Sequence, residues 1–126
     1  MADAIFVSNN GVNATVELLR TSNNVYVGVG TDGTGANQGD TDLGAELNGP
    51  GNRGTADVTN LGSGIIQWDE TYTNSSGNSQ GLQEVGIFDN ISIGSGVLYA
   101  RGTFTTETLD DSESIQFIIQ VTHLNV

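Results

Sequence analysis

Short runs of β-branched and aromatic residues recur about every ten residues in this sequence, and turn-forming residues separate them. The final run is the clearest, because Ile115, Phe117, Ile119 and Val121 occupy alternate positions. Alternate side chains of a strand point to the same side of a sheet, so this run predicts a strand with one buried face. Short strands at this spacing are typical of a two-sheet sandwich. We therefore expect a mainly β, antiparallel and jelly-roll-like β-sandwich of about 6–8 strands.

The chain has the length of one domain, which we place at residues 1–126. Within it, residues 31–54 are rich in Gly, Asn and Asp, so we expect a long loop there. A loop of this length inside a compact domain is usually functional or mobile. The strands are expected on either side of it, at residues 25–30, 56–61, 65–72, 82–89, 97–104 and 115–124.

One helical pattern lies near the N-terminus. Val12, Val16 and Leu19 recur at positions i, i+4 and i+7, which puts them on one face of a helix. The Ser and Asn residues just before them suit a helix N-cap. We therefore expect one short helix over residues 9–20.

The charge of the sequence is one-sided, since 3 basic residues, all arginine, stand against 15 acidic ones for a formal net charge of -12. Soluble proteins normally intersperse both signs on their surfaces. At about 0.1 M salt the Debye length is roughly 10 Å and such a surface repels itself, whereas about 1 M salt screens it. We interpret the composition as adaptation to near-saturated brine. It also argues against nucleic acid or membrane as a partner, and no apolar stretch is long enough to span a bilayer.

Four segments together resemble a recurring β-domain of tailed-virus (phage-like) structural proteins. They are Glu-Val-Gly-Ile-Phe-Asp at 84–89, Leu-Tyr-Ala-Arg-Gly-Thr-Phe at 98–104, the strand and loop at 26–34, and an Asp-x-x-Leu-Gly-x-Glu segment within 40–47. The family is associated with tail fibres, baseplates and other virion surfaces. The resemblance implies a non-enzymatic virion protein, and the acidic composition adds that the virus infects a haloarchaeon.

The shared motifs consist of glycines, apolar strands and one arginine, which are structural residue types. Gly86 lies inside a strand, where a side chain would collide with a neighbour. Arg101 is flanked by apolar strand residues, and a buried arginine needs a carboxylate partner. Glu84 and Asp89 on a neighbouring strand are the candidates. We expect this ion pair to be structural rather than part of a ligand site.

The sequence offers little that an enzyme could use, so we expect no catalytic residues and no cofactor. Its single histidine, His123, has no accompanying nucleophile elbow, since the one Gly-x-Ser-x-Gly match, at residues 77–81, lies in a predicted polar loop between two strands and not in a strand-to-helix turn. There is also no cysteine. Carboxylate pairs such as Asp69-Glu70 and Asp110-Asp111 could suggest a glycosidase. With 15 acidic residues, however, adjacent pairs arise by chance.

The acidic loop raises the question of a cation site. Asp32, Asp40, Asp42 and Glu46 supply oxygen ligands at a spacing that can surround Ca²⁺ or Mg²⁺. The remaining positions of an EF-hand are missing. The density of carboxylates in this chain predicts such clusters without any ion, so a solvated acidic loop is the preferred interpretation.

A glycan-binding surface is the rival function. Trp68, Tyr26, Tyr72 and Tyr99 could stack against sugars, although Trp68 shares a strand face with Ile66 and Tyr72 and therefore belongs by default in the core.

From these observations we expect a structural protein on the virion surface, in a high-salt environment. It would serve as a tail-fibre or baseplate element, or as a capsid decoration or turret component; the sequence does not separate these placements. It would act through association with other virion proteins and with itself, as a trimer or pentamer joined through strand edges. The alternative is a receptor-binding module that recognises host cell-surface glycans.

Overall fold

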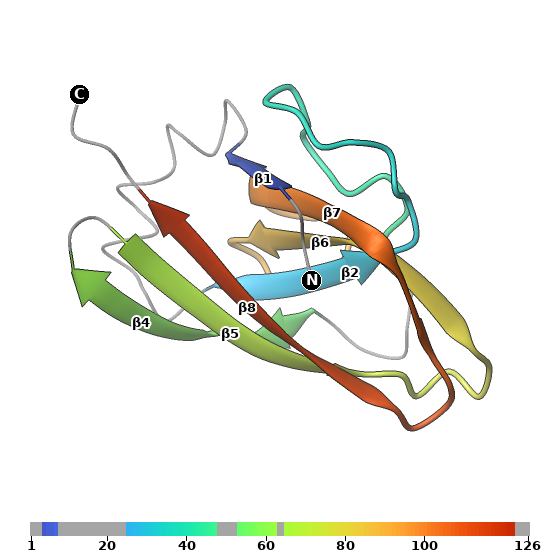
Figure 1. Ribbon diagram of the computed structural model, residues 1–126. Coiled ribbons are helices and arrows are strands. Elements are labelled where there is room, and N and C mark those ends of the chain that lie inside the picture. Colours follow the sequence, from blue (N-terminus) through green and yellow to red (C-terminus); the bar gives the residue numbers. More distant parts are fainter. Residues whose placement is uncertain (1–3, 8–24, 48–52, 63–64, 123–126) are drawn as a thin grey trace.

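The computed structural model describes residues 4–7, 25–47, 53–62 and 65–122. Within them the chain forms eight strands in two antiparallel sheets (Figure 1). The larger sheet contains, in spatial order, β1 (Ala4–Val7), β7 (Leu98–Leu109), β6 (Gln80–Phe88), β2 (Tyr26–Gly30) and β3 (Gly54–Thr55). The smaller sheet contains β4 (Asp57–Gly62), β5 (Ile65–Thr73) and β8 (Ser114–Thr122).

This architecture confirms the predicted mainly β fold of antiparallel strands in two sheets, while the finer jelly-roll-like arrangement stays a prediction. Each segment predicted as a strand coincides with an observed strand, give or take a few residues at its ends. The helix expected over 9–20 lies outside the described residues, as does His123. No helix in the described part of the chain is long and apolar enough to cross a membrane.

The main hydrophobic core lies between the two sheets. Trp68 of β5 packs edge-on against Tyr99 of β7, with ring centroids 5.4 Å apart, and each side chain is only 1% exposed. Phe104 of β7 packs against Phe117 of β8 in a tilted arrangement, with ring centroids 5.7 Å apart. These aromatic contacts join the sheets directly. The alternation along β8 is as predicted, since Phe117, Ile119 and Val121 are buried whereas Gln116, Ile118 and Gln120 are exposed.

The outer face of the larger sheet is covered as well. Residues 31–47, which we call the capping loop, leave the end of β2 and return beside the same strand (Figure 1). Gly30 forms an isolated bridge with Glu46, and the Leu47 amide donates to the Val29 carbonyl at 3.0 Å. Part of the predicted 31–54 loop is therefore anchored along a strand edge.

Two turns hold the far ends of the sheets together. The β5–β6 turn and the β7–β8 turn lie side by side, and Asn74 is fully buried between them (Figure 1). Its side-chain amide donates to the carbonyls of Leu109 at 2.9 Å and Asn78 at 2.7 Å. Its backbone amide donates to the Glu113 carbonyl at 2.8 Å. One asparagine thus links both turns that connect the two sheets.

We expect Asn74→Ala to lower the free energy of unfolding by about 2 kcal/mol, because it removes the side-chain donor from the carbonyl of the buried Leu109 and one of the two donors from the Asn78 carbonyl. Asn78→Ala is the matched control, since Asn78 is exposed and its hydrogen bonds use backbone atoms. Urea unfolding followed by Trp68 fluorescence measures both variants. Equal effects at the two positions would contradict the clamping role of the Asn74 side chain.

Candidate functional site

A layer of buried charge separates the capping loop from the larger sheet. We call it the charged layer, and it comprises two arginines and three carboxylates: Arg53, Arg101, Asp40, Glu46 and Glu84. The exposed fraction is 0% for Glu84, 3% for Arg101 and 4% for Arg53. Charged side chains are rarely buried to this extent unless they are paired and hydrogen-bonded.

Glu84, in β6, is the centre of this layer. Its carboxylate accepts backbone N–H bonds from Gly44 and Ala45, both at 2.8 Å, and from Asp32 at 3.1 Å. It also accepts from the Arg101 guanidinium at 3.0 Å. A single carboxylate therefore satisfies donors at the start and at the end of the capping loop.

Glycines on β2 and on β6 itself make room for this arrangement. Gly30 lies opposite Glu84 in the β2–β6 register, and a Cβ at Gly30 would overlap the carboxylate and lie 2.5 Å from the Ala45 carbonyl oxygen. A Cβ at Gly86 would lie 2.8 Å from the Leu43 side chain, which is the collision expected from the sequence. Because these glycines have no side chains, the backbone of the loop can approach Glu84 closely.

Arg101, in β7, continues the network to the middle of the loop. Besides Glu84, its guanidinium donates to the Asp40 carboxylate at 3.1 Å and to the Asp32 carbonyl at 3.2 Å. Of the two carboxylates named from the sequence, the structure brings Glu84 to Arg101. Asp89 instead accepts the Val97 amide at 2.7 Å and closes the β6–β7 turn.

A second buried pair, not anticipated from the sequence, joins Arg53 to Glu46. The guanidinium binds both carboxylate oxygens, at 2.7 and 2.8 Å, and donates to the carbonyls of Asn90 and Ser95. It also lies 3.4 Å above the centre of the Phe88 ring, a cation–π contact. The signal in the sequence that could have found this pair is the rarity of arginine. The chain has no lysine and only three arginines, so its arginines do not serve to make the surface soluble and are expected in structural pairs.

The four carboxylates considered as cation ligands take separate partners. Asp40 and Glu46 pair with arginines, and Asp42 accepts the next backbone amide at 3.0 Å. Asp32 accepts the Thr34 amide at 2.8 Å, and hydrogen bonds from Thr34 lower the pKa of its carboxyl. Among the residues that the structure describes, no three His, Cys, Asp or Glu side chains gather in a way that could hold a metal ion.

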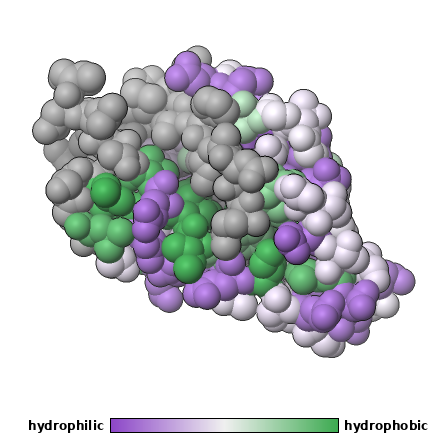
Figure 2. All heavy atoms as spheres, in the orientation of Figure 1, coloured by the Kyte–Doolittle hydropathy of each residue, from purple (hydrophilic) through white to green (hydrophobic). Residues whose placement is uncertain are grey.

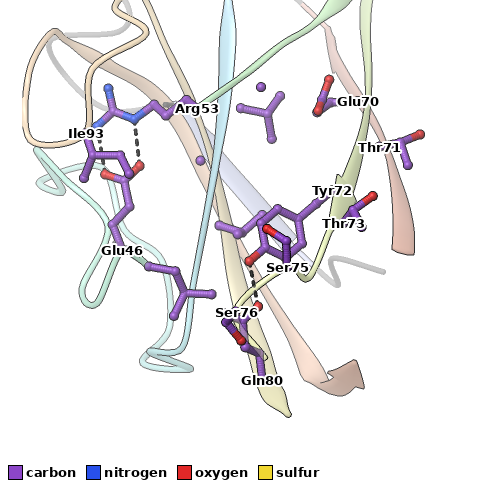
Figure 3. A pocket seen from close by; sticks show the side chains of 15 residues that line it. Glu46, Arg53, Glu70, Thr71, Tyr72, Thr73, Ser75, Ser76, Gln80 and Ile93 are labelled. Atoms are coloured by element: carbon purple, nitrogen blue, oxygen red, sulfur yellow. Dashed lines mark hydrogen bonds and ion pairs between the residues drawn. The ribbon is translucent and has the colours of Figure 1, made fainter. Parts of the chain in front are cut away.

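A pocket of about 180 Å³ lies beside the charged layer, between the edge of the larger sheet and β5. In Figure 3 the Arg53–Glu46 pair lies at one end, and Tyr72 points toward Gln80 at the other. The Tyr72 hydroxyl donates to the Gln80 side chain at 2.6 Å. Pockets for drug-sized ligands usually measure about 300–1,000 Å³, so this one is small. Its Arg53–Glu46 pair and its Tyr72 hydroxyl are already engaged with each other and with Gln80, respectively.

Glu70 lines this pocket, and its pKa is raised by burial and, to a smaller extent, by the negative charge of Asp57. A carboxyl with a raised pKa in the folded state destabilises the fold at pH values above that pKa. The cost disappears as the pH falls through the folded pKa and below the ordinary value of 4.5, because the group is then protonated in both states.

We therefore expect Glu70→Gln to raise the free energy of unfolding at pH 7 and to have little effect at pH values below 4.5. Urea unfolding at both pH values, with the exposed Glu107→Gln as control, measures the difference. A gain that persists unchanged at low pH would show that the carboxylate charge is not its cause.

The four aromatic residues of the proposed glycan platform do not form one surface. Trp68 and Tyr99 are each 1% exposed in the core, as the strand register of Trp68 predicted. Tyr72 is held by Gln80, and Tyr26 is only partly exposed. Stacking on a sugar requires an accessible ring face, which Trp68 and Tyr99 do not offer.

Comparison with known protein-family models, curated proteins and solved structures gives no match to this chain.

Proposed function

We propose that this chain is a jelly-roll-like, non-enzymatic building block on the exterior of a tailed virus that infects a halophilic host. It would belong to a tail fibre or baseplate, or to a capsid decoration or turret. The observation that carries the non-enzymatic role is the charged layer, whose ion pairs hold the capping loop on the sheet. Catalytic acids, bases and nucleophiles must reach a substrate, whereas Arg53, Arg101 and Glu84 are buried and all five groups are paired.

The viral placement is supported by the resemblance of residues 26–47 and 84–104 to virion β-domains. These segments supply most residues of the charged layer and the glycines around it, so they act together in holding the capping loop on the sheet. A β-sandwich whose capping loop is held rigidly on the sheet is suited to a structural protein that packs against other virion proteins. The alternative, a receptor-binding module for host glycans, loses the buried Trp68 and Tyr99 as stacking residues.

The direct test is the protein content of density-purified virus particles from an infected halophilic culture. We expect mass spectrometry to detect the chain at a fixed copy number per particle, and immunogold labelling to place it on the tail or the capsid. A chain found only in the host-cell fraction would contradict the proposal. Binding of the purified chain to host envelope, lost on treatment that removes glycans, would favour the alternative.

The high-salt environment yields a separate prediction. Every basic side chain in the described residues belongs to the charged layer, so the charge exposed there is carried by carboxylates. We expect the urea midpoint to fall when NaCl is lowered from molar values to about 0.1 M, because repulsion is then less screened. The double variant Asp57→Asn/Glu107→Gln, which removes two exposed charges, should lose less. Equal losses in both proteins would rule out surface repulsion as the cause.

A further inference from the structure

Strand β8 is a long sheet edge without a partner in the described part of the chain. It is the last strand of the smaller sheet, and there β5 is its hydrogen-bonded neighbour on one side (Figure 1). Its nine residues pair with β5 in one continuous register without a bulge. The outer side of β8 therefore presents a straight row of backbone donors and acceptors.

The other sheet edges are protected in ways that β8 is not. Strands β3 and β1 have only two and four residues. Strand β4 has six, carries Asp57 and has a register shift between Asn60 and Gly62. Short length, charge and bulges are the usual devices against edge-to-edge pairing. Strand β8 reads Ser-Ile-Gln-Phe-Ile-Ile-Gln-Val-Thr, with no charge and no proline, in a chain with 15 acidic residues.

We infer that β8 is the seam through which two copies of this chain associate, antiparallel about a two-fold axis at Ile118. The inference deepens, and rests on, the self-association part of the proposed function. Ile118 is the middle residue of β8, so this register pairs all nine residues with their counterparts. It also sets the 45% exposed Ile118 against its own copy and Gln116 against Gln120.

The apolar surface of the smaller sheet agrees with such a seam. Figure 2 shows apolar atoms gathered over this sheet, with hydrophilic bands between them. Leu61 and Ile118 are two of the three large hydrophobic side chains that are well exposed in the described residues. Pairing through β8 would cover Ile118 and extend the three-stranded sheet to six strands.

Charge also favours this edge over the rest of the surface. The nearest carboxylate on the same sheet face is Asp69, which lies beside Ile118 on β5. In the paired assembly the two copies of Asp69 are separated by three strand spacings, about 14 Å. The Debye length at about 1 M salt is roughly 3 Å, so their repulsion is screened. Association along β8 therefore brings no carboxylates together.

The symmetry of the seam differs from the ring expected from the sequence. A strand that pairs with itself makes an isologous contact, which closes as a dimer. A trimer or pentamer would instead require β8 to pair with a different edge, and the alternatives are shorter or bulged. An even subunit number is therefore part of the inference.

Single cysteines test the seam cleanly, because the chain has none of its own. Two residues opposite each other in an antiparallel pair lie within disulfide range. We expect the Ile118→Cys variant to form a covalent dimer on oxidation in molar NaCl, and the Thr59→Cys variant, exposed on β4 of the same sheet, to remain at background.

The register is tested by two further variants. In the proposed pairing, position 116 lies about 13 Å along the strand from its own copy, beyond the roughly 7 Å Cα separation that a disulfide spans. Gln116→Cys alone should therefore cross-link poorly, and a mixture of Gln116→Cys with Gln120→Cys should cross-link well. Light scattering of the wild-type chain in the same buffer should give a mass of two subunits, or an even multiple.

Each result decides a different point. The seam is overturned if Ile118→Cys cross-links no more than Thr59→Cys. If the wild-type chain is then found to be a trimer or a pentamer, self-association itself still stands. A monomeric wild type overturns both the seam and self-association, while the particle composition still tests the virion role. Circular dichroism shows whether each variant is folded, and because position 118 is exposed, we expect cysteine there to be tolerated.

Discussion

Replacing Glu84 with glutamine should lower the free energy of unfolding by about 3–5 kcal/mol, the typical cost of leaving a buried charge without its partner. Arg101 would keep only Asp40 and one carbonyl, and three loop amides would share a weaker acceptor. Domains of this size are stable by roughly 5–15 kcal/mol, so the loss is a large fraction of the total. Urea unfolding monitored by Trp68 measures it, with Glu107→Gln as the exposed control.

A second measurement separates release of the loop from general weakening. Hydrogen exchange of the 31–47 segment should accelerate more in Glu84→Gln than exchange of β5 and β8, because Glu84 contacts the loop and not the smaller sheet. The double variant Glu84→Leu/Arg101→Met should remain destabilised, since the loop amides still lack an acceptor. Wild-type stability in that double variant would mean that the backbone bonds to Glu84 contribute little.

Replacing Arg53 with alanine should cost about 3–5 kcal/mol as well, for a related reason. The substitution leaves the Glu46 side chain, 8% exposed, without its bidentate partner. It also removes the donor to the carbonyls of Asn90 and Ser95 and empties the space above Phe88. The same unfolding assay measures the loss.

Arg53→Lys provides the conservative comparison. Lysine keeps the positive charge, but its single ammonium cannot match two carboxylate oxygens and two carbonyls at once. We expect a loss between that of Arg53→Ala and zero. A lysine variant as stable as the wild type would show that charge alone, rather than the planar fork of arginine, stabilises this site.

The class of fold and the positions of the strands were predictable because they depend on local patterns. Alternation along β8 and the spacing of turns are properties of neighbouring residues, and burial of Phe117 and Ile119 followed from them. The need of Arg101 for a carboxylate was also predictable, since a cation between apolar strand residues must be compensated.

Which carboxylate meets Arg101, and what that contact does, depended on the tertiary structure. Glu84 reaches Arg101 and the loop because it lies opposite Gly30, 54 positions earlier in the sequence, in the β2–β6 register, whereas Asp89 falls beyond the end of β6. The Arg53–Glu46 pair likewise forms only when the capping loop returns to the edge of β2.

The sequence by itself determined the two-sheet β character and the acidic surface, because period-two hydrophobicity and charge balance need no knowledge of long-range contacts. Only the tertiary structure decided that the glycine-rich loop is fixed by buried ion pairs. Strand register and close approach of backbone to side chain bring residues from distant segments together, and no local pattern encodes those distances.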